Sequence, residues 1–181
     1  MRIIAGSFRS RHLETPPSSL TRPTSDRTRQ AIFNILQTLI DLTNTRVLDT
    51  FAGSGAMGLE ALSRGAGHIT FIEKHAEVLR VLQHNIQTLA VNDHTTLIRA
   101  DAQLPPKTKD PVELVFLDPP YGKNLALPTL TALAQQGWLK DGMIVVLEMG
   151  AKERIPILES FDVLDQRTYG AAQVVFLQYE G

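Results

Sequence analysis

The chain has 181 residues, with 18 basic and 19 acidic side chains, no cysteine and 43% hydrophobic residues. This length fits one globular domain, and the lack of cysteine excludes disulfides, thiolate metal sites and cysteine catalysis. No apolar stretch reaches the roughly 18 residues that a membrane span needs, and Met1–Arg11 lacks the apolar core of a signal peptide, so we expect a cytoplasmic protein without membrane association.

The charge of the chain is unevenly distributed. Residues 1–29 hold six arginines against two acids, a net charge of +4, whereas the remainder holds 12 basic and 17 acidic residues, a net charge of −5. The planar fork of arginine matches the oxygen pairs of phosphate groups, so the basic segment could contact a nucleic acid. A solvated basic face is the alternative interpretation.

The N-terminal residues predict a hairpin followed by an extended arm. The runs Arg2–Ala5 and Arg11–Glu14 are short and extended, and the turn between them is rich in arginine. Thr15–Pro23 carries three prolines and several hydroxyl groups, which indicates an arm or a linker. Ser25 is a plausible N-cap, and apolar residues then recur at helical spacing as far as Leu39.

Strand patterns and helix patterns alternate after residue 46. Strands are expected at Val47–Thr50, Ile69–Glu73, Thr95–Arg99, Leu114–Asp118 and Ile144–Glu148, and helices at Gly55–Ser63, Ala76–Leu89 and Leu125–Gln136. This alternation argues for βαβ units and a mostly parallel sheet in an α/β fold. Two further extended runs, Phe161–Thr168 and Gln173–Tyr179, leave no room for a helix between them and must pair antiparallel.

A glycine-rich loop follows the first expected strand. Gly53, Gly55 and Gly58 fit the pattern GxGxxG, in which backbone amides and a helix N-terminus approach a ligand closely. Glu73 ends the next strand, 20 residues after Gly53, and a carboxylate at this spacing can bind ribose hydroxyls. Asp49 favours a methyltransferase over a nicotinamide enzyme, because an acid would repel a pyrophosphate but attract a methionine ammonium. The structural alternatives are a tight strand-to-helix turn for the glycines, an exposed strand-end acid for Glu73 and a cap on the loop amides for Asp49.

The fourth expected strand ends in a stiff acidic turn, Asp118, Pro119, Pro120 and Tyr121. Ligands of open parallel sheets bind beyond the carboxyl ends of the strands, so this turn should face the glycine loop. Asp118 offers an acceptor and Tyr121 a ring on which a flat base can stack. The turn therefore suits an exocyclic amine of a nucleobase, held by its hydrogens while the nitrogen receives a methyl group. The alternative is a proline-stiffened turn without a function.

These motifs resemble those of the S-adenosylmethionine-dependent amino-group methyltransferases that carry an (Asp/Asn/Ser)-Pro-Pro-(Tyr/Phe/Trp) motif. The chain is more specifically similar to the bacterial 16S rRNA guanine-N2 methyltransferase family of the RsmD type, through the segments RIIAGSFRSRHLETP, RPTSDRTRQAIFNIL, LDTFAGSGAMGLEALSRGA, FIEKHAEV and FLDPPYGKN. The resemblance implies a Rossmann-like class I methyltransferase fold, with a seven-stranded mostly parallel sheet, an antiparallel last strand and an N-terminal β-hairpin arm.

The resemblance also implies which residues form the site. The cofactor S-adenosylmethionine is assigned to Thr24, Asp49, Phe51, Gly53, Gly55, Glu73, Lys74, Asp101 and Ala102, and the target amine to the catalytic turn Asp118, Pro119, Pro120 and Tyr121. The rRNA contacts are assigned to Arg2, Arg9, Arg11 and Arg22. The helix that follows Arg22 would form a wall of the cofactor pocket. Asp101 could equally be a surface-turn acid, His75 is interpreted as a helix-start residue without chemistry, and no metal is implied.

Three functions remain open at this point. The first is methylation of guanine N2 in 16S rRNA by a monomer built from a hairpin and arm (1–23) and a methyltransferase domain (24–181). Its expected substrate is a loop guanine on small-subunit assembly particles, because little of the chain lies outside the catalytic sheet to read naked RNA. The second is an adenine-N6 methyltransferase acting on DNA or RNA, although 181 residues leave no room for a DNA target-recognition domain. The third, a non-catalytic RNA-binding assembly factor, is disfavoured by the intact acids.

Overall fold

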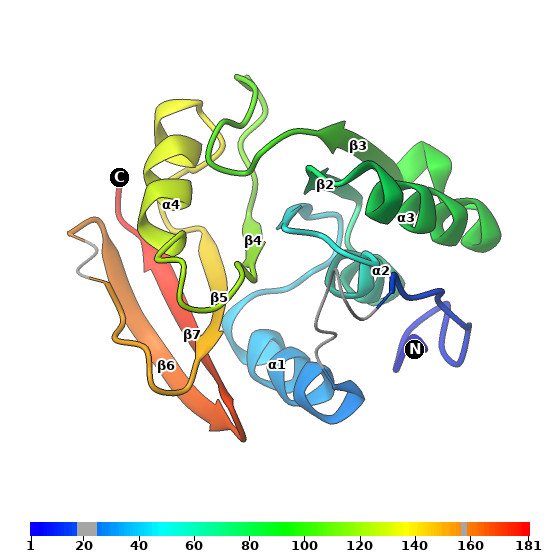
Figure 1. Ribbon diagram of the computed structural model, residues 1–181, viewed down its shortest axis with the longest axis horizontal. Coiled ribbons are helices and arrows are strands. Elements are labelled where there is room, and N and C mark those ends of the chain that lie inside the picture. The colour runs from blue at the N-terminus through cyan, green and yellow to red at the C-terminus, as the bar shows by residue number, and fades with distance from the viewer. Residues whose placement is uncertain (18–24, 157–158) are drawn as a thin grey trace.

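The computed structural model describes residues 1–17, 25–156 and 159–181 (Figure 1). Its helices are α1 (Asp26–Leu39), α2 (Ala56–Ser63), α3 (Ala76–Leu89) and α4 (Ala126–Gln135), with a 3-10 turn η1 (Asn92–His94). Its strands are β1 (Arg46–Thr50), β2 (His68–Glu73), β3 (Thr95–Arg99), β4 (Leu114–Leu117), β5 (Ile144–Gly150), β6 (Phe161–Tyr169) and β7 (Ala172–Tyr179). The helices and strands predicted after residue 25 are therefore confirmed, with ends that differ by at most two residues, whereas the extended runs Arg2–Ala5 and Arg11–Glu14 form no strands.

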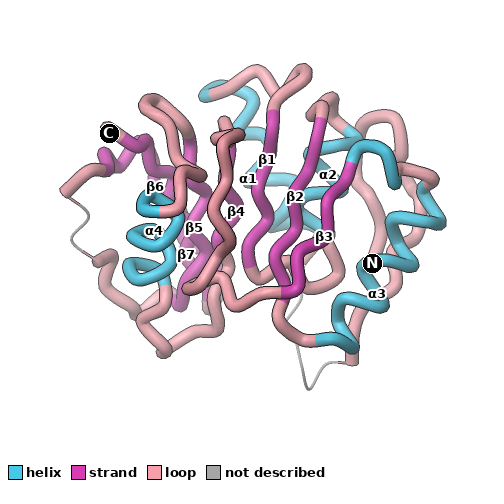
Figure 2. The backbone as a smooth tube through the Cα atoms, turned by 90° about the horizontal axis from the view of Figure 1, so that it is seen from above, coloured by secondary structure: helices cyan, strands magenta, loops and turns pink. Residues whose placement is uncertain are grey.

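The strands form one sheet in the order β3-β2-β1-β4-β5-β7-β6, and Figure 2 shows it as a twisted layer between helices. Strands β1 to β5 pair in parallel, whereas β7 pairs antiparallel with both β5 and β6. The predicted mostly parallel sheet with a reversed last strand is confirmed. Among the described residues, no helix combines the length and the apolar character needed to cross a bilayer.

Among the strand ends that differ from the prediction, those of β4 and β5 have a clear physical reason. β4 ends at Leu117 rather than Asp118, because Pro119 has no amide N–H to donate to the ladder. β5 continues to Gly150, two residues beyond the predicted end, because its last residues still pair with β7, Gly150 opposite Ala172. The backbone of the acidic turn therefore lies beyond the strand ladder, whereas the end of β5 is paired with β7.

The core lies on both faces of the sheet. One cluster joins α1, α2 and α3 to one face, with Phe33 of α1 against Phe116 of β4 at 5.7 Å between ring centroids. The other cluster packs Leu130 of α4 and Leu48 of β1 on the opposite face. Adjacent residues of β1 thus point into different clusters, which explains why the central strands are apolar throughout instead of alternating. The strand ends are fixed relative to one another by this double packing.

The N-terminal hairpin pairs at a single bridge, Arg2 with His12, and its residues pack on the domain. Ile3 and Leu13 are buried in the cluster that contains α1 and α2. Gly6 has a φ of +80°, and a Cβ there would lie 1.8 Å from the carbonyl oxygen of Ser63 at the end of α2, so only glycine fits. The boundary after residue 23 stays a prediction, since it falls within residues 18–24, outside the described part of the chain.

Candidate functional site

A pocket of about 520 Å³ lies at the carboxyl ends of β1, β2 and β4. It brings together ten residues predicted from the sequence, namely Asp49, Phe51, Gly53, Glu73, Lys74, Ala102, Asp118, Pro119, Pro120 and Tyr121. Gly55 and Asp101 lie outside its lining, and Arg22 and Thr24 lie outside the described residues. The acids of the glycine loop and the acidic turn therefore face one cavity, although they are separated by up to 69 positions in the chain.

The carboxyl group of Asp49 is buried beside the glycine loop. Its Oδ2 atom accepts a hydrogen bond from the backbone N–H of Gly58 at 2.9 Å. Burial raises the pKa of Asp49 to about 8, and the negative charge of Glu73 adds to the rise, while the bond from Gly58 opposes it. A buried acid that is costly to ionise is well suited to a cationic ligand, which would stabilise its charged form.

Glu73 ends β2 with both carboxylate oxygens engaged. Oε2 accepts from the Gly53 N–H at 3.2 Å and Oε1 from the His75 N–H at 2.8 Å. These two backbone donors fix the carboxylate at the pocket wall, where its remaining lone pairs can accept from a ligand. His75 is the N-cap of α3, as predicted, and it also lines the pocket.

The outlying predicted residues have structural explanations. Gly55 caps α2 with a φ of +78°, and a Cβ there would lie 2.3 Å from Leu82 Cδ1. Asp101 accepts from the Gln103 N–H at 3.0 Å, the geometry of a surface turn, and its other oxygen lies 3.5 Å from Lys74 Nζ. Their assignment to the cofactor stays a prediction. Within the described part of the chain, no three His, Asp or Glu side chains gather as a metal site would require.

The acidic turn is connected to β5 through Tyr121. Its hydroxyl donates to Glu148 Oε1 at 2.8 Å, so the ring is held from its far end. The sequence analysis did not single out Glu148. A signal was present, because Glu148 is the one charged residue in the otherwise apolar run IVVLEMG of β5. A charge inside a central strand is unusual enough to indicate a specific partner.

The N-terminal segment forms one wall of the pocket through Met1, Thr15 and Pro16, which the sequence analysis also missed. No periodic pattern marks these residues, because they lie outside helices and strands. The sequence analysis instead assigned this wall to the helix that follows Arg22. Among the described residues, α1 contributes none of the lining.

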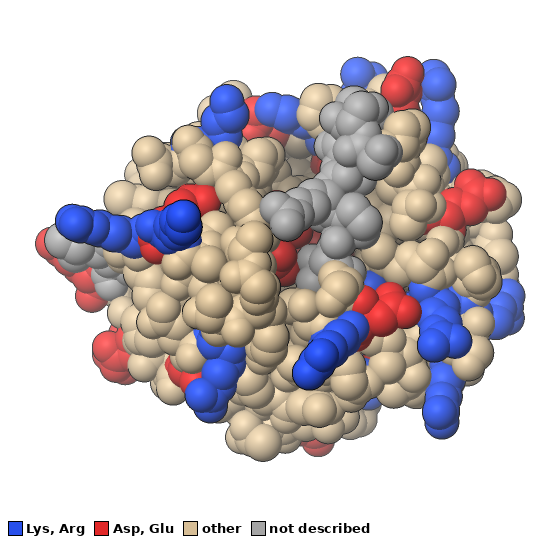
Figure 3. Space-filling model, turned by 60° about the horizontal axis from the view of Figure 1, so that its bottom comes forward, with Lys and Arg blue, Asp and Glu red and all other residues tan. Residues whose placement is uncertain are grey.

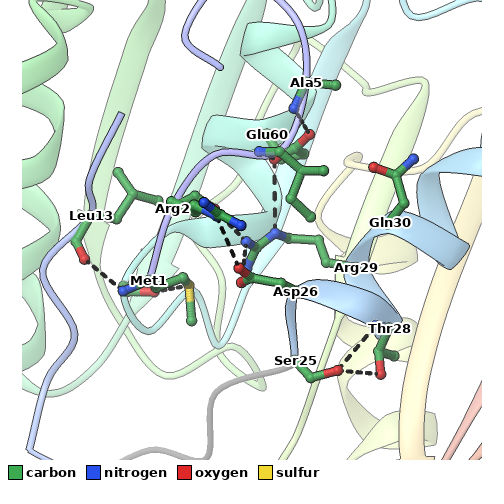
Figure 4. Close-up of polar contacts among 12 residues, drawn as sticks. Met1, Arg2, Ala5, Leu13, Ser25, Asp26, Thr28, Arg29, Gln30 and Glu60 are labelled. Atoms are coloured by element: carbon green, nitrogen blue, oxygen red, sulfur yellow. Dashed lines mark hydrogen bonds and ion pairs between the residues drawn. The ribbon is translucent and has the colours of Figure 1, made fainter. Parts of the chain in front are cut away.

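A buried ion pair holds this wall in place (Figure 4). Arg29 of α1 and Glu60 of α2 are both fully buried, with Nε and Oε2 3.8 Å apart. Arg29 Nη2 donates to the Arg2 carbonyl at 2.5 Å, and Glu60 accepts from the Ile4 and Ala5 amides at 2.7 and 3.1 Å. The ion pair thus binds the N-terminal backbone to the helix that begins at the glycine loop.

The arginines assigned to RNA differ in their surroundings. Arg2 is mostly exposed and lies 3.7 Å from the Asp26 carboxylate. Arg11 donates to the Thr88 carbonyl at 2.7 Å, near the C-terminal end of α3, where a cation is favourable. Arg9 is exposed at the turn of the hairpin. Two of the three described arginines therefore already have a partner within the protein.

Comparison with known proteins identifies relatives along nearly the whole chain. The family model described as conserved hypothetical protein 95 matches residues 1–178. The chain is 36% identical over 180 residues to ribosomal RNA small subunit methyltransferase D of Escherichia coli K12, covering 99% of this chain and 89% of the relative. It is 35% identical over 174 residues to the protein of the same name from Haemophilus influenzae, covering 94% and 89%. The solved structure of yhhF from Escherichia coli superposes with a TM-score of 0.86 at 34% identity, covering 100% and 98%.

Loss of the buried ion pair should destabilise the protein strongly. We expect Glu60→Ala to lower the free energy of unfolding by about 3–5 kcal/mol, because the buried Arg29 would keep only the partly exposed Asp26 as an acidic partner, and the Ile4 and Ala5 amides would lose their acceptor. Chemical denaturation measures this loss, and hydrogen exchange should show lost protection of the Ile4 and Ala5 amides. The control is Glu113→Ala, which also removes an acceptor of a backbone amide but at a partly exposed position. Equal losses for the two variants would contradict a special role of the pair.

The raised pKa of Asp49 predicts that the stability of the folded protein depends on pH. In the folded protein this pKa is raised to about 8, so the unfolded chain ionises Asp49 first and stability is lost as pH rises toward 8. Asparagine stays neutral, so Asp49→Asn should be more stable than the parent, by a margin that grows between about pH 4 and pH 8 and then levels off. Unfolding in denaturant across this range measures the margin, with the exposed Asp162→Asn as the control. A margin independent of pH would refute the assignment.

Proposed function

The chain belongs to the conserved hypothetical protein 95 family, the family of the RsmD type methyltransferases, and we propose that it methylates the exocyclic N2 of a guanine in 16S rRNA with S-adenosylmethionine as the methyl donor. The observation that carries the proposal is the convergence of Asp49, Glu73 and Asp118 on one pocket. Asp49 suits a cation, Glu73 suits the two hydroxyl groups of a ribose, and Asp118 lies on a stiff turn beside the aromatic ring of Tyr121. A pocket of this volume is in the usual range for small ligands.

The lining fits the donor molecule in its chemistry. Asp49 is a buried acid that would accept the methionine ammonium, and Glu73 would accept from the two ribose hydroxyls. The side chains of Ile72 and Ala102 offer an apolar surface for the adenine. When bound, S-adenosylmethionine supplies a methyl group on a positively charged sulfur. The protein has to hold this group and the acceptor nitrogen in line and exclude water.

The acidic turn would hold the acceptor. The Asp118 carboxylate accepts a hydrogen from the amine and stabilises the positive charge that grows on the nitrogen as the new bond forms. Tyr121 stacks on the base, and Glu148 keeps its hydroxyl in place. Pro119 and Pro120 restrict the backbone, so little further ordering is needed when the base enters.

Guanine on assembling small subunits is favoured over the alternatives. The relatives named above are small-subunit rRNA methyltransferases, which favours RNA over DNA. Adenine N6 is the second candidate, because the acidic turn recognises an amine on a ring and both bases carry one. A base must leave its stack to reach the turn, and a loop nucleotide leaves it at the lowest cost. We further propose that the enzyme acts as a cytoplasmic monomer.

The product distinguishes these functions. Purified protein should transfer labelled methyl groups to 16S rRNA in partly assembled small subunits, and nuclease digestion followed by mass spectrometry should identify N2-methylguanosine. N6-methyladenosine would favour the adenine alternative, and binding without any product would favour the non-catalytic one. Equal rates on protein-free 16S rRNA and on assembly particles would overturn the particle as substrate.

Two substitutions should separate catalysis from cofactor binding. Asp118→Ala should lower kcat by about a hundredfold or more while leaving the affinity for S-adenosylmethionine unchanged, because it removes an electrostatic and positioning group. Asp118→Asn, which keeps an acceptor oxygen, should lose less. Glu73→Ala should mainly weaken the affinity for the donor, measured by calorimetry. Equal effects of Asp118→Ala and Glu73→Ala on donor affinity would contradict these separate roles.

A further inference from the structure

A single carboxylate fastens the acidic turn to the loop after β5. Glu153 Oε1 accepts from the Gly122 N–H at 3.0 Å and from the Gly150 N–H at 3.1 Å. Gly122 directly follows Tyr121, and Gly150 is the last residue of β5. A Cβ on Gly150 would lie 2.6 Å from the same Glu153 oxygen, so a larger residue there would displace the Glu153 side chain. The loop of residues 151–154 is thereby fixed beside the residues that line the pocket.

The same loop is held from behind by β7. Gln173 is buried, and its Nε2 donates to the carbonyls of Gly150 at 3.0 Å and Glu153 at 2.6 Å. The Ala151 N–H donates to the Ala171 carbonyl at 2.9 Å. The backbone of this loop is therefore bonded on both sides, which makes it a built part of the site and not a loose connection.

Three cations project from the two fastened segments, and we call them the cationic rim: Lys123, Lys152 and Arg154. All three are exposed, and none forms an ion pair within residues 1–17, 25–156 and 159–181. Glu153 lies between Lys152 and Arg154 in the chain, and its carboxylate accepts from the backbone amides of Gly122 and Gly150. Figure 3 brings forward the face at which β4 and β5 end, and Lys and Arg side chains are spread over it among Asp and Glu side chains.

We propose that the cationic rim binds phosphates of the RNA strand that carries the target base, with Glu153 as the positioning residue. This inference rests on the function proposed above and assigns it a second RNA contact, beside the N-terminal arginines. A nucleotide that leaves its stack has to be held by its backbone, and phosphate contacts set position while base contacts set identity. The rim adjoins Tyr121 along the chain, so it would hold the backbone next to the stacked base. Arg2 and Arg11, by contrast, already have partners within the protein.

Removal of rim charge should weaken RNA binding in a salt-dependent way. We expect Lys152→Ala with Arg154→Ala to raise the Kd for 16S rRNA about tenfold at moderate salt, and to reduce the slope of log affinity against log salt by about one unit per lost contact. The matched control is Lys107→Ala with Lys109→Ala, which also removes two exposed cations. These lie beside the C-terminal end of α4, where the Thr108 N–H donates to the Gln136 carbonyl. The control pair should keep the parent's affinity and slope.

Substitution of Glu153 tests whether its charge or its positioning of the two loops matters, because these two effects would change the affinity for RNA in opposite directions. Removal of a negative charge alone would tighten RNA binding, whereas release of the two loops would weaken it. We expect Glu153→Ala to bind RNA several-fold more weakly than the parent and to have a lower kcat/KM. Glu153→Gln loses the same charge but keeps an acceptor for Gly122 and Gly150, so it should bind at least as tightly as the parent. Thermal melting and donor affinity confirm that each variant is folded.

The outcomes separate this inference from the proposed function. A parent protein that methylates RNA, with rim variants that match it in affinity and salt slope, would overturn the inference alone. Tighter binding by Glu153→Ala would overturn the positioning role of Glu153. A parent protein that neither binds nor methylates 16S rRNA would overturn the proposed function, and the rim would lose its ligand with it.

Discussion

The site depends on the carboxyl group of Asp49, which folding buries at the end of β1. Asp49 lies where β1 passes into the glycine loop, close enough to Glu73 to feel its charge, and its pKa is raised to about 8. Backbone donors from Gly53, Gly58 and His75 are the means by which the fold tolerates two acids in one place. Because burial makes Asp49 costly to ionise, a positively charged ligand in the pocket would stabilise its charged form.

The walls of the pocket are held by side chains that lie outside it. Arg29 and Glu60 bind the N-terminal backbone to α2, so the wall formed by Met1, Thr15 and Pro16 moves with the helix that starts at the glycine loop. Glu153 likewise joins the acidic turn to the end of β5, because it accepts from the Gly122 and Gly150 amides. Both devices use a carboxylate to accept two backbone amides, which joins segments that are distant in sequence. Binding residues on loops gain their geometry from such supports.

The distribution of charge gains a structural meaning from these contacts. The six N-terminal arginines give the basic segment its excess charge, yet one is buried in the ion pair with Glu60 and two others contact the protein. Net charge alone overstates the number of cations that this segment can offer to a nucleic acid. Cations in the acidic part of the chain, next to Tyr121 and after β5, are exposed and close to the pocket lining. The net charge summed over this acidic part of the chain does not reveal these exposed cations.

The sequence by itself determined the sheet, its reversed strand, and the placement of Asp49, Gly53, Glu73 and Asp118 at one edge of it. Hydrophobic runs and GxGxxG are local patterns, and parallel strands place their carboxyl ends at one edge, so Asp49, Glu73 and Asp118 could be placed together in advance. Only the tertiary structure decided what surrounds them. The pairing of Arg29 with Glu60, the contact of Tyr121 with Glu148 and the two bonds of Glu153 join elements through side chains at no fixed spacing. The same holds for Met1, Thr15 and Pro16, because packing of irregular backbone against the core has no period for a sequence to display.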